Sequence, residues 1–481
     1  MSQDAVGGKR ARSEANQGGT AGVDALVPLG RGRFSFSAPL VLGKCPWYGT
    51  IEQVKGGTVN TRQNLPVVTL VVVLGLLLAA CAPPATQAPT SVPPTEASPD
   101  DSAAAEGTAY KIGFCAAITG GGSSLGLPER ATAEMLAEQY SSGITGADGV
   151  HHDLEFVIYD TESNPDTAAS VASRLITEDE VDVLVCGTLS GNSMAVMPIA
   201  TENEIAMISM ASARSIIEDP ETGETRKWIF KTPQENLHSG EWQARYLETQ
   251  GITNICDLYE NGGYGQDCLA QTTAAVEPKG IEIVYVDSFE RSDTEFPQLT
   301  GVQASGCEAI VVGAIPPGAS MVVVAASEVL PDVPVIQGHG VCNQTFIDLA
   351  GDAAEDVVTP CGRLMVADSL PDSDPQKAVL LKYIADYTTF TDGEPIDTFG
   401  GHAWDALMWA IEGLESLNDG LSLAERRAAV RDYIENNIND WPGTGGVFNI
   451  SPDDHLGLTY DDLTFVKVVD GSWAYFPPEE W

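Results

Sequence analysis

The chain has 481 residues, of which 25 are Lys or Arg and 68 are Asp or Glu, so its formal net charge is −43. A surface of this charge repels phosphate backbones and anionic lipid head groups, which excludes nucleic acid as a partner. The charge itself favours solubility rather than one specific acidic site. The length allows two domains with substantial cores.

The amino-terminal segment carries signs of export. Residues 67–80 form an uncharged apolar run, shorter than the roughly 20 residues of a membrane-spanning helix and typical of a secretory signal core. Lys55 and Arg62 precede it, and small residues lead into Cys81. We expect a signal peptide over residues 59–80, with a short uncleaved anchor as the alternative. Either segment would place the rest of the chain outside the cytoplasm.

The segments on either side of the signal show no sign of a folded domain. Residues 1–58 have no clear apolar periodicity, and we expect an unstructured leader that precedes a true start near Val59. Residues 81–107 are rich in Pro, Ala, Thr and acidic side chains but poor in large apolar ones. This composition predicts a disordered tether, because too little apolar surface is present to offset the entropy of ordering.

From residue 110 onward, apolar strand patterns alternate with helical patterns. The first series predicts strands at 110–118, 154–160, 181–187 and 204–210, separated by helices at 128–140, 165–179 and 193–203. After a long helix at 235–250, the second series predicts strands at 252–260, 281–289, 308–314 and 333–338, with helices at 264–276, 297–304, 318–330 and 343–350. Such alternation indicates parallel sheets covered on both faces. We therefore expect an α/β protein with two doubly wound parallel-sheet lobes and a ligand cleft between the carboxyl ends of their strands.

Three sequence patterns are candidates for a cofactor-binding, catalytic or ligand-binding site. The glycine-rich stretch 118–126 departs from GxGxxG, because the sixth position counted from Gly120 is Leu125, so no dinucleotide cofactor is expected. The serine-rich stretch 186–193 lacks the GxSxG spacing of a hydrolase nucleophile. Among the six histidines, His339 alone follows an apolar strand where a ligand would bind, although a turn histidine with its hydrogen bonds satisfied is the plainer interpretation.

Seven cysteines follow the tether: Cys115, Cys186, Cys256, Cys268, Cys307, Cys342 and Cys361. They form no CxxC pair and no His/Cys cluster with metal-ligand spacing, so no metal site is expected. In an exported protein, disulfides are the better interpretation. The odd number leaves at least one thiol unpaired, and the connectivity stays open.

Several segments resemble one family in order along the chain: KIGFCAAITGG, the serine cluster after the third strand within CGTLSGNS, EIAMISMASA, LYENGGYGQD, VIQGHGVCNQTFIDLAGDAAEDVV and GVFNISPDDHLGL. They are similar to the substrate-binding proteins of branched-chain amino-acid ABC transporters, which are type I periplasmic binding proteins of the leucine/isoleucine/valine-binding family. The resemblance covers about residues 108–480, and Cys81 resembles the lipidated cysteine of bacterial lipoproteins. It implies a monomeric solute-binding protein without enzyme activity or cofactor, tethered to the membrane through Cys81 beside an ABC permease.

The family also implies three crossings between the lobes, which we place near 231–234, 363–367 and 441–445. Lobe 1 is then expected over residues 108–231 plus 366–441, and lobe 2 over 232–365 plus 442–481. Cys342 and Cys361 flank the segment FIDLAGDAAEDVV and are our candidate disulfide.

The family's ligand-binding positions can be carried over residue by residue. Its carboxylate-binding positions fall on Ser190, Ala211, Ser212 and Ala213, where Ala213 replaces a usual threonine. Its aromatic positions fall on Leu125, Tyr264 and Ile315, of which only Tyr264 is retained. The acidic residue that pairs with a substrate ammonium falls on His339.

This last replacement shapes our expectation about the solute. An imidazole cannot supply the negative charge that a buried ammonium needs. We therefore expect a carboxylic acid, an amide or a similar small polar solute whose acceptor His339 can address, unless Glu260 or Asp287 replaces the missing acid. The alternatives are a ligand-sensing receptor subunit of the same fold and an exported hydrolase that would use Ser190 with His339.

Overall fold

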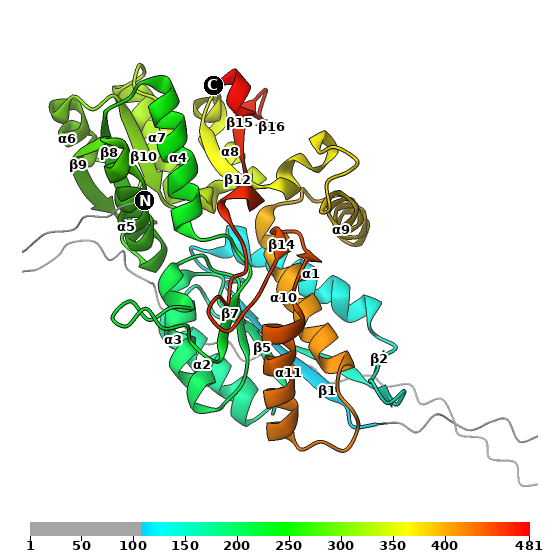
Figure 1. Ribbon diagram of the computed structural model, residues 1–481. Coiled ribbons are helices and arrows are strands. Elements are labelled where there is room, and N and C mark those ends of the chain that lie inside the picture. The colour runs from blue at the N-terminus through cyan, green and yellow to red at the C-terminus, as the bar shows by residue number, and fades with distance from the viewer. Residues whose placement is uncertain (1–106) are drawn as a thin grey trace, which may run out of the picture. The chain divides into compact units, whose positions relative to one another are not determined.

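The computed structural model describes residues 107–481, which belong to the second of two compact units of the chain. The expected leader, signal peptide and Cys81, and all of the expected tether except Gly107, lie outside the described residues. Two α/β lobes are present, each built on its own sheet (Figure 1). No helix between residues 107 and 481 is long and apolar enough to cross a membrane.

The first lobe contains a five-stranded parallel sheet in the order β4-β1-β5-β6-β7. Its strands are β1 Tyr110–Ala116, β4 Leu154–Asp160, β5 Val183–Cys186, β6 Met207–Ser209 and β7 Ile229–Lys231. The helices packed on it are α1 Ser123–Gln139, α2 Pro165–Thr177, α3 Ser190–Glu202, α9 Lys377–Phe390, α10 Thr398–Glu415 and α11 Leu423–Asn437. Two short hairpins join β2 Ile144–Thr145 to β3 His151–His152, and β13 Trp441–Pro442 to β14 Val447–Phe448.

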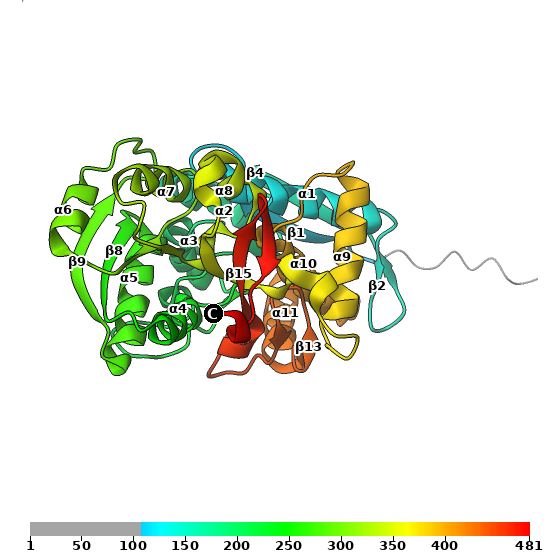
Figure 2. The same ribbon diagram turned by 90° about the horizontal axis from the view of Figure 1, so that it is seen from above.

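The second lobe contains a seven-stranded sheet in the order β16-β15-β12-β11-β10-β8-β9. Its parallel strands are β8 Asn254–Glu260, β9 Glu282–Phe289, β10 Ala309–Gly313, β11 Val335–Gln337 and β12 Val358–Gly362. The antiparallel pair β15 Leu463–Val469 and β16 Ser472–Tyr475 extends it at the β12 side. The helices lie on both faces, with α4 Asn236–Gln250 and α5 Gly263–Val276 opposite α6 Gln298–Ser305, α7 Gly318–Val329 and α8 Gln344–Ala350 (Figure 2).

The expected fold class is therefore confirmed, because both lobes are parallel sheets covered by helices on two faces. The buried strands explain the continuous apolar runs in the sequence, since a strand buried on both faces needs no polar side. One addition was not expected: the last two strands run antiparallel to β12 at the edge of the second sheet.

In each lobe, a glycine allows a helix to start close to the end of a strand. A Cβ atom on Gly126 would collide with the carbonyl oxygen of Ala117, and a Cβ atom on Gly265 would collide with that of Glu260. Because glycine has no Cβ, α1 and α5 can pack tightly behind the ends of β1 and β8. Their first turns consequently lie at the carboxyl edge of each sheet.

Three pairs of cysteines are bonded in the structure: Cys115 with Cys186, Cys256 with Cys307, and Cys342 with Cys361. The first pair joins opposed residues of β1 and β5 within the first sheet. The other two pairs lie within the second lobe. Cys268 on α5 is the remaining thiol of the described chain, and it is buried.

The crossings between lobes are bound to one another by hydrogen bonds. At the first crossing, the Thr232 hydroxyl donates to the carbonyl of His402 at 2.9 Å, and the Gln234 amide donates to the carbonyl of Gly445. The buried carboxylate of Asp405 accepts from the backbone N–H of Thr444 at 2.6 Å and of Gly445 at 2.8 Å. The crossings therefore converge beneath α10.

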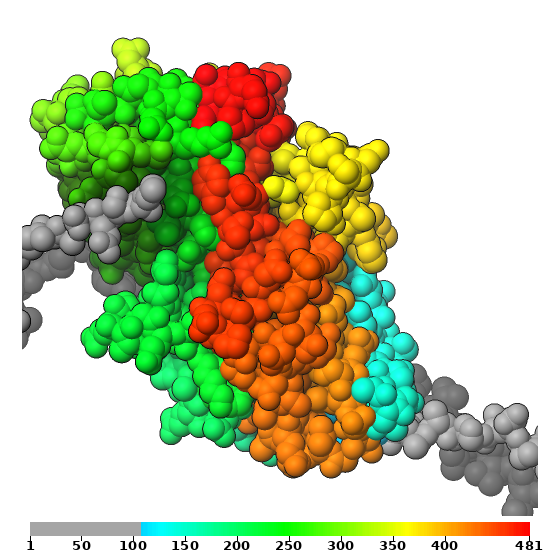
Figure 3. Space-filling model, viewed as in Figure 1, coloured from blue at the N-terminus to red at the C-terminus, as the bar shows by residue number. Residues whose placement is uncertain are grey.

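The final crossing differs in position from our expectation. Four apolar side chains that follow residue 442 pack into the core of the first lobe: Phe448, Ile450, Leu456 and Leu458. The chain joins the second sheet only at β15. The segment from 442 to 481, orange to red in Figure 3, thus lies against both lobes rather than against the second alone.

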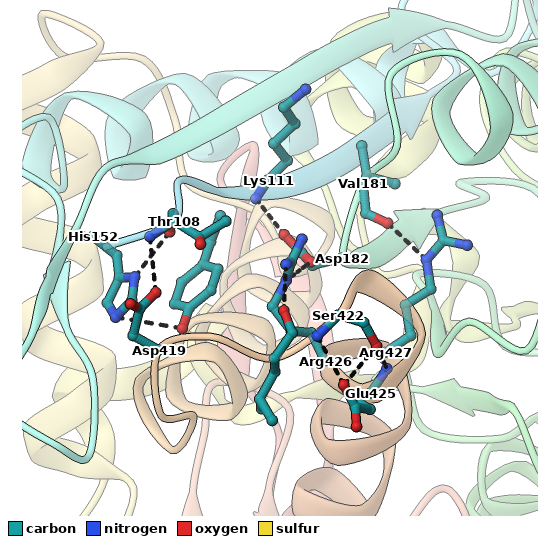
Figure 4. Close-up of polar contacts among 12 residues, drawn as sticks. Thr108, Lys111, His152, Val181, Asp182, Asp419, Ser422, Glu425, Arg426 and Arg427 are labelled. Atoms are coloured by element: carbon teal, nitrogen blue, oxygen red, sulfur yellow. Dashed lines mark hydrogen bonds and ion pairs between the residues drawn. The ribbon is translucent and has the colours of Figure 1, made fainter. Parts of the chain in front are cut away.

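Hydrogen bonds and an ion pair join the edge of the first sheet at which the strands begin to the segments around it (Figure 4). Asp182 accepts from the backbone N–H of Lys111 at 2.8 Å and pairs with Arg426 at 2.6 Å. Close by, the N–H of Thr108 donates to Asp419 at 3.1 Å, and His152 Nδ1 lies 2.8 Å from the Thr108 carbonyl. The first described residues are thereby held at the edge of the sheet where the strands begin.

Candidate ligand-binding site

A pocket lies between the two lobes, at the carboxyl ends of their strands. The first lobe contributes the segments after β5 and β6 and the first turns of α1, α3 and α10, and the second lobe contributes the segments after β10 and β11 and the start of α5. The pocket holds about 400 Å³ of empty space, including the part open to solvent. Because this volume includes open solvent, it is an upper bound on the space for a ligand, so only a small solute would fit in this arrangement.

The structure places seven of the eight residues predicted for the site around this pocket: Leu125, Ser190, Ala211, Ser212, Tyr264, Ile315 and His339. The eighth, Ala213, is fully buried next to them and does not line the space. Sequence reasoning missed the other large side chains of the lining, which are Thr188, Leu189, Met210, Phe399 and His402.

Apolar side chains from both lobes form most of the wall. Leu125 and Leu189 come from the first lobe, Ile315 and Tyr264 come from the second, and Phe399 comes from the start of α10. The hydroxyl of Tyr264 accepts from the backbone N–H of Gly340 at 2.8 Å, which binds it to its own lobe. Tyr264 therefore offers the pocket chiefly the apolar face of its ring.

Ser190 is a buried polar group that lacks a partner. It is the first residue of α3, and its Oγ forms no hydrogen bond with any described residue although the side chain is only 1 % exposed. Leaving a buried hydroxyl unpaired costs roughly 1–3 kcal/mol. A solute or a water molecule in the pocket would remove this cost.

His402 has the same property on the other side of the pocket. It lies on α10 and is 6 % exposed, and its Nδ1 has no partner among the described residues. Burial and the nearby Lys231 lower the pKa of His402 to about 3, so its imidazole is neutral. No sequence pattern pointed to this residue, because α10 follows the pocket's other segments by more than fifty positions.

His339 forms part of a hydrogen-bonded chain. Its Nε2 lies 2.8 Å from Asn236 Oδ1, and Asn236 Nδ2 donates to Asp267 at 2.6 Å. Ser212 Oγ also donates to Asn236 Oδ1, at 3.1 Å. Burial, together with the neighbouring His402 and the Lys231 cation, lowers the pKa of His339 to about 3. The imidazole is consequently neutral in this position.

Lys231 lies behind the pocket as a buried cation. It is fully buried at the end of β7, and its Nζ donates to the carbonyl of Ser212 at 2.7 Å. Burial lowers the pKa of Lys231 to about 8, although the carboxylates of Glu235 and Asp267 act in the opposite direction. The side of the pocket near Ser212 therefore sits close to a positive charge.

No Asp or Glu side chain of the described chain lines the pocket. Glu260, which could have replaced the missing acid, pairs with Arg291 at 3.0 Å and accepts from the backbone N–H of Ile315 at 3.2 Å. Asp287 accepts from the hydroxyl of Tyr285 on the same strand. Neither acid lines the pocket, and no group of residues within 107–481 forms a metal site.

The lobes touch at the edge of the pocket. A Cβ atom placed on Gly263 of the second lobe would lie 3.0 Å from the backbone nitrogen of Gly191 in the first. The backbone N–H of Thr398 also lies 3.4 Å from the carbonyl of Cys342 across the gap. The pocket is thus enclosed by two lobes that meet directly.

Comparisons with known proteins agree with this architecture. A family profile described as periplasmic binding protein matches residues 109–472. An extracellular ligand-binding receptor from Rhodopseudomonas palustris HaA2 has 24 % sequence identity and a TM-score of 0.70, with 76 % of this chain and 99 % of that chain covered. No curated protein matches the chain.

Two further structures show the same fold with ligands. One is the branched-chain amino acid transporter substrate-binding protein LivJ from Streptococcus pneumoniae in complex with isoleucine (20 % identity, TM-score 0.63, 76 % and 97 % covered). The other is an ABC transporter solute-binding protein from R. palustris in complex with benzoate (18 % identity, TM-score 0.61, 77 % and 96 % covered). At these identities the likeness concerns the fold.

The chain belongs to the periplasmic binding protein family, since the family match spans most of its length. Proteins of this family are extracytoplasmic, bind small-molecule ligands and work with ABC transporters. The resemblance drawn from the sequence motifs is therefore confirmed at the level of family and fold.

Proposed function

We propose that this protein captures a small polar solute between its lobes and delivers it to an ABC permease. The observation that carries this proposal is the pocket itself, because Ser190 and His402 line it and their atoms Ser190 Oγ and His402 Nδ1 are buried without partners among the described residues. Buried polar atoms without partners are rare in folded proteins, and two of them facing one enclosed space favour a bound molecule.

The lining favours a solute without an ammonium group paired to an acid. A buried ammonium needs an opposite charge nearby, and the described lining contains no carboxylate while the cation of Lys231 lies behind it. A carboxylic acid, an amide or a similar solute avoids this cost. The ligands of the structural neighbours include an amino acid, isoleucine, and a carboxylic acid without an ammonium group, benzoate.

Closure of the lobes would follow the binding of such a solute. Ser190 belongs to the first lobe, while Tyr264 and His339 belong to the second. A solute that contacts both sets is bound more tightly by the closed arrangement and raises its population by this difference alone. Recognition by a permease could then depend on the closed arrangement.

The proposal also includes export of the chain and its attachment to the cell membrane. We propose that the chain is held at the outer face of the cell membrane by a lipid on Cys81, because the apolar run and small residues before Cys81 are typical of a lipoprotein signal. Metabolic labelling with a radioactive fatty acid tests this, since a Cys81→Ala variant should lose the label.

A thermal-shift screen tests the capture of a solute. The purified protein would be heated with amino acids, carboxylic acids, amides and short peptides in turn. A solute at 100 times its dissociation constant stabilises the protein by roughly 2.7 kcal/mol, which gives a measurable rise in Tm. A Ser190→Ala variant should lose most of the rise, and esters or amides that are hydrolysed by the wild type but not by this variant would instead favour the hydrolase.

A further inference from the structure

The orientation of the Asn236 side chain is fixed by its neighbours. Its amide lies between Asp267 on one side and the pair Ser212 and His339 on the other. Asp267 Oδ1 also accepts from the Gln271 amide at 3.5 Å, so this carboxylate acts as an acceptor. The amide nitrogen of Asn236 therefore faces Asp267, and its oxygen faces the pocket residues.

This orientation determines the hydrogen positions on both pocket residues. A carbonyl oxygen can only accept, so His339 Nε2 carries the hydrogen that it donates at 2.8 Å, and Ser212 Oγ donates its own hydrogen at 3.1 Å. A neutral imidazole has one hydrogen, so Nδ1 of His339 is left with a lone pair. Nδ1 forms no hydrogen bond within the described chain, and His339 lines the pocket.

Two neutral acceptors thus lie next to each other in the pocket, which no carboxylate of the described chain lines. They are His339 Nδ1 and the lone pairs of Ser212 Oγ, both fixed by the same oxygen of Asn236. The Lys231 cation, 2.7 Å from the Ser212 carbonyl, opposes a second positive charge at this corner. An uncharged donor is the group that complements two neutral acceptors beside a cation.

We infer that the solute carries an uncharged hydrogen-bond donor, a carboxamide N–H or a hydroxyl O–H, which binds His339 Nδ1 with Ser212 Oγ as the second acceptor. This inference rests on the proposed function and reverses our expectation from the sequence, which had His339 donating to an acceptor of the solute. Asn236 is the positioning residue, because it touches no solute and acts by fixing the hydrogens of its two neighbours.

Nitrogen NMR of the imidazoles in the ligand-free full chain tests the first step without any ligand. We expect His339 as the neutral form with its hydrogen on Nε2 throughout the pH range of stability. An Asn236→Ala variant should show a mixture of both neutral forms, and an Asn261→Ala variant, changed on an exposed loop, should match the wild type. A hydrogen on Nδ1 of His339 in the wild type would overturn the inference.

Calorimetry with matched probes tests the second step. The pairs are 2-hydroxy-3-methylbutanoate with 2-oxo-3-methylbutanoate, and benzamide with methyl benzoate, in which only the first member carries an uncharged donor. In at least one pair the donor should bind the wild type about tenfold more tightly or better, because its absence leaves buried acceptors unpaired. Asn236→Ala should reduce the preference to within about threefold.

A gain of binding provides the control for misfolded variants. His339→Asp supplies the missing charge and should bind valine more tightly than the wild type does, while losing preference for the uncharged donors. Equal binding within both pairs by the wild type would overturn the inference and leave the proposed function standing. Failure of every probe would also overturn it, and the wider solute screen then decides separately whether the protein captures any solute.

Discussion

Gly263 offers a direct test of whether the lobes must meet when a solute is bound. It is the first residue of α5, and a methyl group there would lie 3.0 Å from the nitrogen of Gly191 and 3.4 Å from the carbonyl carbon of Ser190. Both neighbours are backbone atoms of the other lobe, so they cannot rotate away. The lobes would have to separate by a few tenths of an ångström to admit it.

The expected effect follows from this geometry. Overpacking a close contact costs roughly 1–3 kcal/mol, and Gly263→Ala should therefore weaken solute binding by about 5- to 150-fold. The Tm of the ligand-free protein should not fall, because alanine is favoured over glycine within a helix and the new contact involves only the opposite lobe. Calorimetry with the tightest solute of the thermal-shift screen measures the first quantity, and a melting curve measures the second.

Gly262 provides the matched control, since a methyl group there would meet nothing closer than Glu260 Oε1 at 3.5 Å within its own lobe. Gly262→Ala should bind the solute as the wild type does. If Gly263→Ala and Gly262→Ala have the same affinity, the contact between lobes contributes nothing to capture and our account of closure is wrong.

Three other predictions concern a ring, a disulfide and a buried acid. Tyr264→Ala should weaken solute binding by roughly 1–3 kcal/mol in calorimetry, because the ring forms part of the apolar wall; unchanged affinity would make Tyr264 a packing residue only. Peptide mass spectrometry without reduction should find Cys342 joined to Cys361, a link worth about 3 kcal/mol of stability in the loop-entropy model, whereas two free thiols would refute the pairing. Burial raises the pKa of Asp257 to about 7, whereas in the unfolded protein this carboxyl releases its proton near pH 4. The free energy of unfolding therefore falls as the pH rises from about 4 to about 7. Asp257→Asn should accordingly gain up to roughly 4 kcal/mol relative to the wild type between pH 4 and pH 8 in urea unfolding, and a constant difference would refute this.

The fold could be predicted from the sequence because burial on both faces leaves a simple pattern. The strands Val183–Cys186 and Ala309–Gly313 are free of polar side chains, and the helices between the strands have their own period. The ends of the elements were harder to predict. We expected the first helix to begin at Pro128, because proline is typical of a first turn, but α1 begins at Ser123. The close approach of Gly126 to Ala117 fixes this start, and such a contact cannot be seen in a linear pattern.

The candidate site could be predicted only where it lies on segments that resemble the family. Ser190, Tyr264 and His339 stand in such segments, directly after or near the ends of strands. Asn236, which contacts the lining residues Ser212 and His339, does not stand in such a segment, and neither does His402, which lines the pocket. Both lie near the starts of helices that begin after the chain has crossed between the lobes. The direction of the hydrogen bond at His339 depends on Asn236, so our inference that His339 accepts from the solute could not be drawn from the sequence, which favoured His339 as a donor.

The repeated crossing of the chain also has a consequence for how the protein folds. The first lobe buries Trp409 of α10 in its core, yet α10 is made only after the chain has passed through most of the second lobe. The second sheet in turn adds β15 and β16 from the last residues of the chain. Each lobe thus depends on contacts between segments far apart in sequence, which slow folding because long loops must close first. A chain that folds late remains unfolded while it leaves the ribosome, and this is the state in which a protein can be threaded through a membrane before its lobes form.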